Sequence, residues 1–235
     1  MLNARSADEL RATAEEFSQD LQVQHSGGQV EWYDADLSDP EQVIGLIDAC
    51  EDQLGPVDIL VSNTGGPPAG RFGDLNNDQQ WLDAYNLLVM APVRLCRGVI
   101  PGMAERGWGR IIFITSTSIK QPILHLALSS IVRPAVAGLS KTLALEYADR
   151  GITSNVVLPG PYDTERSVET LRLQSEATGE SIPELMKKRA ASIPVKRSGD
   201  PMELGAVVAF LASQQAAYTT GTVLWVDGGT VQTTL

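Results

Sequence analysis

Short apolar segments alternate with longer amphipathic segments along almost the whole chain, and this alternation constrains the fold more than any other feature. Runs such as VDILV and GRIIFI have the length and β-branched content of buried strands. The segments between them place apolar residues at helical spacing. Strands that alternate with helices of ten or more residues indicate a parallel sheet with helices on both faces. The sequence therefore predicts a three-layer α/β/α fold.

The expected elements follow from this pattern. Strands are expected at residues 30–33, 57–61, 111–114, 154–158 and within 221–229. Helices are expected at residues 6–17, 38–55, 78–106, 128–148 and 201–213, with a broken helix at 165–191. Ser38 is the expected N-cap of the second helix. We find no internal repeat and no low-complexity linker, so we expect a single domain over residues 1–235.

Charge and cysteine content narrow the classes of function. The chain has 29 Asp and Glu residues against 18 Lys and Arg, which gives a net charge of −11. A surface of this sign repels phosphate backbones and anionic lipids, so neither nucleic acid nor a membrane is an expected partner. Two cysteines are too few for a disulfide framework or a cysteine-rich zinc site, and no metal is expected. No apolar run approaches the length that a bilayer requires, and we expect a cytoplasmic protein.

The carboxyl ends of the expected strands carry the candidate binding residues, because ligands of open parallel sheets bind there. Ser62-Asn63-Thr64-Gly65-Gly66 follows one strand, and its glycines allow a flat ligand to approach the backbone. Thr115-Ser116 follows the next strand, and Pro159-Gly160-Pro161-Tyr162-Asp163-Thr164 follows the one after that. Asp36 comes after an earlier strand. Each piece is weak alone, but their order and spacing together predict one site.

With these motifs the sequence resembles the short-chain dehydrogenase/reductase family from Asn3 to Gly229. The resemblance implies a Rossmann-like fold with a mostly parallel sheet. It also implies roles for single residues: Asp36 and Leu37 would flank the adenine, Asn63 and Gly65 the ribose, and Thr164 the nicotinamide amide. Pro159 and Gly160 belong to the same cofactor-binding motif. Ser116 stands at the family's catalytic serine, and Asn86 at the asparagine that holds a water in a proton relay.

The first departure from the family is at the N-terminus. The family's first strand and its Gly-rich TGxxxGxG turn are missing, because Leu2-Asn3-Ala4-Arg5-Ser6 already resembles the end of the second strand. That turn seats the diphosphate of a dinucleotide on a helix N-terminus. The loss would leave an edge of unpaired backbone groups. One explanation is that Met1 is an internal start of a longer natural protein; the other is that the strand at 30–33 slides beside the strand at 57–61.

The second departure concerns the catalytic pair. The family uses a tyrosine as proton donor and a lysine four residues later, but none of the five lysines here follows a tyrosine at that spacing. Counting from Ser116 places Ser129 at the tyrosine and Arg133 at the lysine. Arg133 keeps its charge and could bind ribose hydroxyls, whereas Ser129 is a poorer acid than a phenol. His125 and Tyr162 are alternative donors, although a loop role and a packing role are the simpler interpretations.

These observations lead to one preferred function and one alternative. Arg5 at the end of the family's second strand favours a 2′-phosphate, so the expected cofactor is NADP(H), with NAD(H) as the alternative. The predicted protein is an NADP(H)-dependent oxidoreductase that reduces a carbonyl, in a 3-oxoacyl group or another ketone or aldehyde, or oxidises the alcohol. The alternative is a catalytically silent relative that binds a ligand or assembles with partner subunits. We also expect a homodimer or homotetramer, packed through the helix of residues 128–148.

Overall fold

The computed structural model describes residues 1–234, without the side chains of residues 21, 22, 24, 165, 166, 169, 170, 173 and 177. Its strands are β1 (Leu2–Ala4), β2 (Trp32–Asp34), β3 (Ile59–Asn63), β4 (Gly109–Ile114), β5 (Ile152–Pro159) and β6 (Val223–Val226). Its α-helices are α1 (Ala7–Gln19), α2 (Leu21–Ser26), α3 (Pro40–Leu54), α4 (Asp78–Tyr85), α5 (Ala91–Arg106), α6 (Ala127–Val132), α7 (Pro134–Tyr147), α8 (Glu165–Thr178), α9 (Ile182–Ser192) and α10 (Pro201–Ala212). Shorter helical turns are η1 (Phe72–Asp74), η2 (Asn86–Met90), η3 (Thr117–Ile119), η4 (Ala148–Arg150) and η5 (Gln214–Ala216).

The strands form two separate parallel sheets. Strands β3, β4, β5 and β6 pair in that order, and β1 pairs with β2. Asn63 lies opposite Ile114 and Pro159 lies opposite Val226, so the carboxyl ends of the larger sheet share one edge. The parallel arrangement is as predicted. The suggestion that the strand near residue 32 slides beside β3 is wrong, because β2 forms its ladder with β1 and the two sheets remain unjoined among the described residues.

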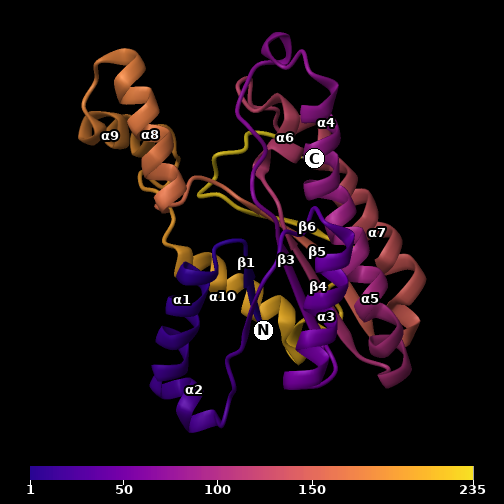
Figure 1. The fold of residues 1–235 in the computed structure, drawn as a ribbon. Helices are drawn as coiled ribbons and strands as arrows, with labels where there is room; N and C mark the ends of the chain where they lie inside the picture. The colour runs from indigo at the N-terminus through magenta and orange to yellow at the C-terminus, as the bar shows by residue number, and fades with distance from the viewer. Residues whose placement is uncertain (235) are drawn as a thin grey trace.

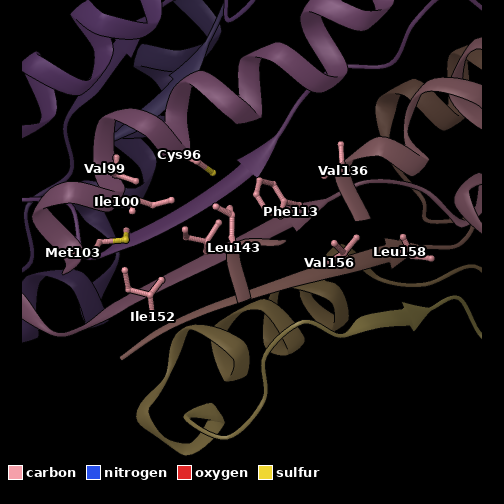
Figure 2. Close-up of a cluster of buried hydrophobic side chains, with 11 residues drawn as sticks. Cys96, Val99, Ile100, Met103, Phe113, Val136, Leu143, Ile152, Val156 and Leu158 are labelled. Carbon is pink, nitrogen blue, oxygen red and sulfur yellow. The ribbon is translucent and has the colours of Figure 1, made fainter. Parts of the chain in front are cut away.

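Helices cover both faces of the larger sheet, which confirms the three-layer Rossmann-like architecture. Helices α5 and α7 lie on one face and α10 on the other (Figure 1). Figure 2 shows Ile100 and Met103 of α5 packed with Leu143 of α7 and Ile152 of β5 in one apolar cluster. Because both faces are covered, β4 and β5 consist almost wholly of buried residues.

Strand β3 is less covered than β4 and β5. Its side chains Ile59 and Val61 are 45% and 42% exposed. Within the described residues β3 has a single paired edge, toward β4, and β1 likewise has a single paired edge, toward β2. The predicted edge of unpaired backbone groups is therefore present, and it faces the smaller sheet.

The segment from Asp78 to Arg106 is one continuous helix, as predicted, made of α4, the π-helical turn η2 and α5. By length and composition alone it could cross a membrane, so the statement that no run approaches that length is wrong. Half of its most apolar stretch is buried inside the fold, however. Its apolar residues are accounted for by packing of α5 against the sheet, including Val99 and Met103.

Two other predicted helices differ in detail. The helix expected at 128–148 breaks into α6 and α7 at Pro134, which supplies no backbone N–H and becomes the first residue of α7. The broken helix at 165–191 is confirmed as α8 and α9, which stand away from the sheets in Figure 1.

The N-cap of α3 is Asp39 and not Ser38 as predicted. The carboxylate of Asp39 accepts the backbone N–H of Glu41. The hydroxyl of Ser38 donates to the carboxylate of Asp36 instead.

Candidate functional site

A cavity of about 310 Å³ lies where the two sheets face each other, at the carboxyl ends of β1, β2 and β3. It brings together five residues that the sequence predicts for the cofactor: Arg5, Asp36, Leu37, Asn63 and Gly65. Thr64 and Gly66 of the candidate motif after the strand also line it. The lining residues that the sequence did not indicate are Asn3, Ala35, Pro67, Pro68, Asp83, Ala84 and Leu87. Both sheets therefore contribute to one site.

Asp36 is fixed at the rim of this cavity. Its carboxylate accepts the hydroxyl of Ser38 at 2.7 Å and the backbone N–H of Ser38 at 2.9 Å. These two hydrogen bonds, with a smaller contribution from the charge of Arg5, hold the pKa of Asp36 below its ordinary value. Arg5 itself is exposed. The rim thus pairs an anchored anion with a cation that is accessible from solvent.

Arg133 connects the predicted catalytic residue Ser129 to the cavity: its backbone N–H donates to the carbonyl of Ser129, and its side chain bonds a lining residue. It lies at the break between α6 and α7 and is only 6% exposed. Its Nη2 donates to the carbonyl of Gly65 at 3.1 Å, and Gly65 lines the cavity. A buried guanidinium is costly unless its N–H groups have acceptors, and the loop after β3 provides one. The structure thereby places a positive charge next to the part of the cavity that Gly65 lines.

The two predicted catalytic serines are linked through a third serine, Ser118, that the sequence analysis missed. Ser116 follows β4 and caps η3, and its hydroxyl oxygen accepts the backbone N–H of Ser118 at 3.1 Å. The hydroxyl oxygens of Ser118 and Ser129 are 2.9 Å apart. The run Ser116-Thr117-Ser118 is rich in hydroxyls, but spacing alone does not indicate which of them meets α6.

Asn86 begins the π-helical turn η2 within the long helix. Its carbonyl accepts the N–H of Ala91, five residues later, so the regular helical hydrogen bonding is interrupted there. Turns of this kind inside α-helices are frequent at functional sites. The side chain is half-buried. Asparagine is disfavoured inside helices by its intrinsic propensity. The distorted helix at Asn86 therefore agrees with a functional use of this residue.

Pro159 is the last residue of β5, Gly160 and Thr164 follow it, and none of the three lines the cavity. A Cβ on Gly160 would lie 2.5 Å from the Cα of Asp227, so close backbone packing against the end of β6 accounts for this glycine. Thr164 is the N-cap of α8, where its hydroxyl accepts the N–H of Ser167. The structure therefore gives two of these residues local roles and leaves them at the same sheet edge as Ser116.

The alternative proton donors occupy positions that suit the simpler interpretations. His125 is exposed in the loop before α6. Tyr162 is buried, and its hydroxyl donates to the carbonyl of Val226 at 3.0 Å. Burial, and then the charges of Glu203 and Asp227, raise the pKa of Tyr162. Its proton is thus already engaged and harder to release.

Comparisons with known proteins identify relatives of this chain. A family model described as enoyl-(acyl carrier protein) reductase matches residues 3–231. The 3-oxoacyl-[acyl-carrier-protein] reductase FabG of Vibrio cholerae is 33% identical over 193 residues, which are 82% of this chain and 74% of that protein. The chain belongs to the short-chain dehydrogenase/reductase family.

Solved structures of family members share the fold closely. L-sorbose reductase from Gluconobacter frateurii, solved with NADPH and L-sorbose, matches with a TM-score of 0.91 and 31% identity, over 99% of this chain and 86% of that one. An NADPH-bound short chain oxidoreductase from Pseudomonas aeruginosa PAO1, described as containing an atypical catalytic center, matches with a TM-score of 0.85 and 27% identity. That match covers 98% of this chain and 86% of the other.

Proposed function

We propose that this protein is an NADP(H)-dependent oxidoreductase that reduces a carbonyl group, of a 3-oxoacyl compound or another ketone or aldehyde, or oxidises the corresponding alcohol. The observation that carries the proposal is the gathering of a nucleotide-sized cavity, the Ser116–Ser118–Ser129 serine cluster and the buried Arg133 at one edge of the sheets. The similarity to a 3-oxoacyl reductase and to two NADPH-bound structures supports both the reaction and the cofactor.

The lining of the cavity fits the nucleoside end of such a cofactor. Arg5 offers an exposed guanidinium, which is suited to a 2′-phosphate, and the fixed carboxylate of Asp36 and the apolar Leu37 lie beside it. Asn63 and Gly65 would contact the ribose. Among the residues lining the cavity, none belongs to the first turn of a helix that could seat a diphosphate. Arg133, bonded to Gly65, is the cation that would face the remainder of the cofactor.

The bound cofactor supplies the hydride, and the chain supplies the proton and the positioning. Ser129 would donate its hydroxyl proton to the oxygen of the carbonyl as that oxygen gains charge. Arg133 would stabilise the same developing negative charge, because its guanidinium stays cationic. Ser116 would orient the carbonyl with its hydroxyl, and Asn86 would hold a water of the proton relay. Pro159, Gly160 and Thr164 would border the nicotinamide from the end of β5.

We also propose that the protein forms a homodimer or homotetramer through α7 and its surroundings. Val136 and Leu143 of α7 are buried against the sheet, whereas Leu145 on the same helix is 76% exposed. Ile131, at the end of α6, is exposed as well. Apolar side chains on a second face of a helix suit burial against another subunit. Light scattering would show a monomer if this part of the proposal is wrong.

The function is tested by a fluorescence titration of the chain with NADPH and, separately, NADH, followed by turnover assays with a panel of ketones and aldehydes. We expect saturable NADPH binding, weaker NADH binding, and NADPH oxidation that Ser116→Ala lowers by about 100-fold or more. NADPH binding without any turnover would indicate the catalytically silent relative instead. A folded chain that binds neither nucleotide would refute the proposal.

A further inference from the structure

The proposed proton donor, Ser129, meets a second buried hydroxyl group. Ser118 lies in η3, directly after β4, and is 0% exposed, while Ser129 lies in α6 and is 5% exposed. Their hydroxyl oxygens are 2.9 Å apart, which is hydrogen-bond distance. Since each hydroxyl carries one hydrogen, only one of the two can donate in this contact.

Burial decides which hydroxyl donates. For the hydroxyl of Ser118, the described residues provide one hydrogen-bond partner, the hydroxyl of Ser129. Ser118 is closed to solvent, so a hydrogen directed elsewhere would be buried without an acceptor, at a cost of about 1–3 kcal/mol. Ser129 is 5% exposed and therefore less completely enclosed than Ser118, so its hydrogen is the better placed of the two to meet a ligand. Burial therefore favours Ser118 as the donor and Ser129 as the acceptor.

The same residue also contacts the other predicted catalytic serine. The backbone N–H of Ser118 donates to the hydroxyl oxygen of Ser116 at 3.1 Å. Both Ser116 and Ser129 thus accept a hydrogen bond from Ser118, one from its backbone and one from its side chain. A hydroxyl that accepts from a fixed neighbour keeps its own hydrogen available, and both of these hydrogens would then be free to point toward a bound carbonyl.

We propose that Ser118 is a positioning residue for carbonyl reduction, which sets the hydroxyl of Ser129 as the proton donor and holds Ser116 beside it. This inference rests on the proposed function. In the reaction, the carbonyl carbon would take the hydride that a bound NADPH supplies, which leaves NADP⁺, and the carbonyl oxygen would take the proton of Ser129. The bond from Ser118 stabilises the oxygen of Ser129 as that proton leaves, and solvent returns a proton after the alcohol departs.

A neutron diffraction structure of the deuterium-exchanged protein tests the hydrogen-bond assignment without any turnover. We expect the deuterium on the hydroxyl of Ser118 to point at the hydroxyl oxygen of Ser129. A deuterium of Ser129 directed at Ser118 would overturn the proposal, because the proposed donor would then be committed to a protein acceptor.

Kinetics of Ser118→Ala test the consequence. We expect kcat for carbonyl reduction to fall about 10-fold to 100-fold, with KM within about twofold of the wild type, since Ser118 does not touch the substrate. Adding Ser118→Ala to Ser129→Ala should cost nothing further, because both act through one proton. Additive losses, or an unchanged kcat for Ser118→Ala, would contradict the proposal.

The chain offers a matched control in Ser140 of α7 and Ser154 of β5. Their hydroxyl oxygens also lie 2.9 Å apart, and both residues are buried, but Ser154 is in the half of β5 away from the carboxyl edge. Ser140→Ala removes the same kind of hydrogen bond and should leave kcat unchanged. An equal loss in both variants would assign the effect to stability. A wild-type chain without turnover would refute the proposed function and the catalytic consequence, while the neutron map would still decide the hydrogen bond.

Discussion

The pKa of Asp36, at the rim of the cavity, is lowered by its neighbours. The hydroxyl and backbone N–H of Ser38 lower the pKa of its carboxyl group, and Arg5 contributes less. A carboxyl group with a lower pKa in the folded chain adds stability that is present above its unfolded pKa and lost as the pH falls through its folded pKa. We expect Asp36→Asn to lower the free energy of unfolding by about 1 kcal/mol or less at pH 7, and by a smaller amount below about pH 4.

Urea unfolding of the wild type and Asp36→Asn at pH 7 and pH 3 measures this difference. Ser38→Ala is the matched control, since it removes the largest cause of the shift and should reduce the pH dependence in the same direction. A gap between wild type and variant that is equal at both pH values would mean that the carboxylate contributes nothing through its charge.

Tyr162 and Ser129 give opposite expectations as proton donors. The hydroxyl of Tyr162 is bonded to the carbonyl of Val226 and its pKa is raised, whereas Ser129, in the proposed direction of its hydrogen bond with Ser118, accepts and keeps its own hydrogen. We expect Tyr162→Phe to leave kcat within about threefold and Ser129→Ala to lower it about 100-fold or more. Steady-state NADPH oxidation by the two variants checks this. The reverse order of effects would make the phenol the donor.

At the level of elements, the caps of α1 and α3 can be compared directly. Asp39 caps α3 by accepting the N–H of Glu41 at 2.9 Å, while Ser6 precedes α1 without a capping hydrogen bond from its side chain. We expect Asp39→Ala to lower the free energy of unfolding by about 1 kcal/mol and Ser6→Ala to change it by less than about 0.5 kcal/mol. Chemical denaturation would measure both. Equal losses would show that position before a helix, rather than the observed bond, determines the effect.

The alternation of apolar and amphipathic segments was sufficient to predict the parallel strands and the helices between them, because each buried strand and amphipathic helix has its own periodicity. Local hydrogen bonding was less predictable. Ser38 and Asp39 are both good N-caps, and only the turn after β2 determines that Ser38 bonds to Asp36. Pro134 could be read as a break, since proline lacks the N–H that a continuous helix requires.

The site was predictable where residues follow strands and unpredictable where distant segments meet. Asp36, Asn63 and Gly65 share the cavity because the carboxyl ends of β2 and β3 both lie at the junction of the two sheets. The contact between Ser118 and Ser129 depends on how α6 packs behind the end of β4, and sequence spacing carries no such information. The family resemblance implies a cofactor role for Gly160, and the structure adds a close contact with Asp227, a requirement of packing that a sequence does not reveal.

At the scale of the whole molecule, the chain consists of a four-stranded sheet with a buried centre and a two-stranded sheet of three-residue strands. The two sheets have no ladder between them among the described residues, and the cavity lies at their junction. Stability in such a molecule is uneven, because regions with few buried contacts open at lower free energy than the core. Strands β4 and β5 belong to the core by this criterion, and β1 and β2 do not.

Native-state hydrogen exchange should therefore separate the two sheets, with amides of β1 and β2 exchanging faster than those of β4 and β5. Saturating NADPH should slow exchange in β1 and β2 in particular. A ligand that contacts Asn3 and Arg5 of the smaller sheet and its loop, and Asn63 of the larger sheet, stabilises the folded arrangement in which the two sheets lie together. Arg5→Ala provides the control, since it weakens the contact on the smaller sheet and should reduce the protection that NADPH gives there. Uniform protection without nucleotide would contradict the idea of two sheets of unequal stability. Among the described residues no backbone ladder joins the two sheets, and a molecule bound in this cavity would contact both of them. A nucleotide effect confined to β4 and β5 would therefore place the ligand elsewhere.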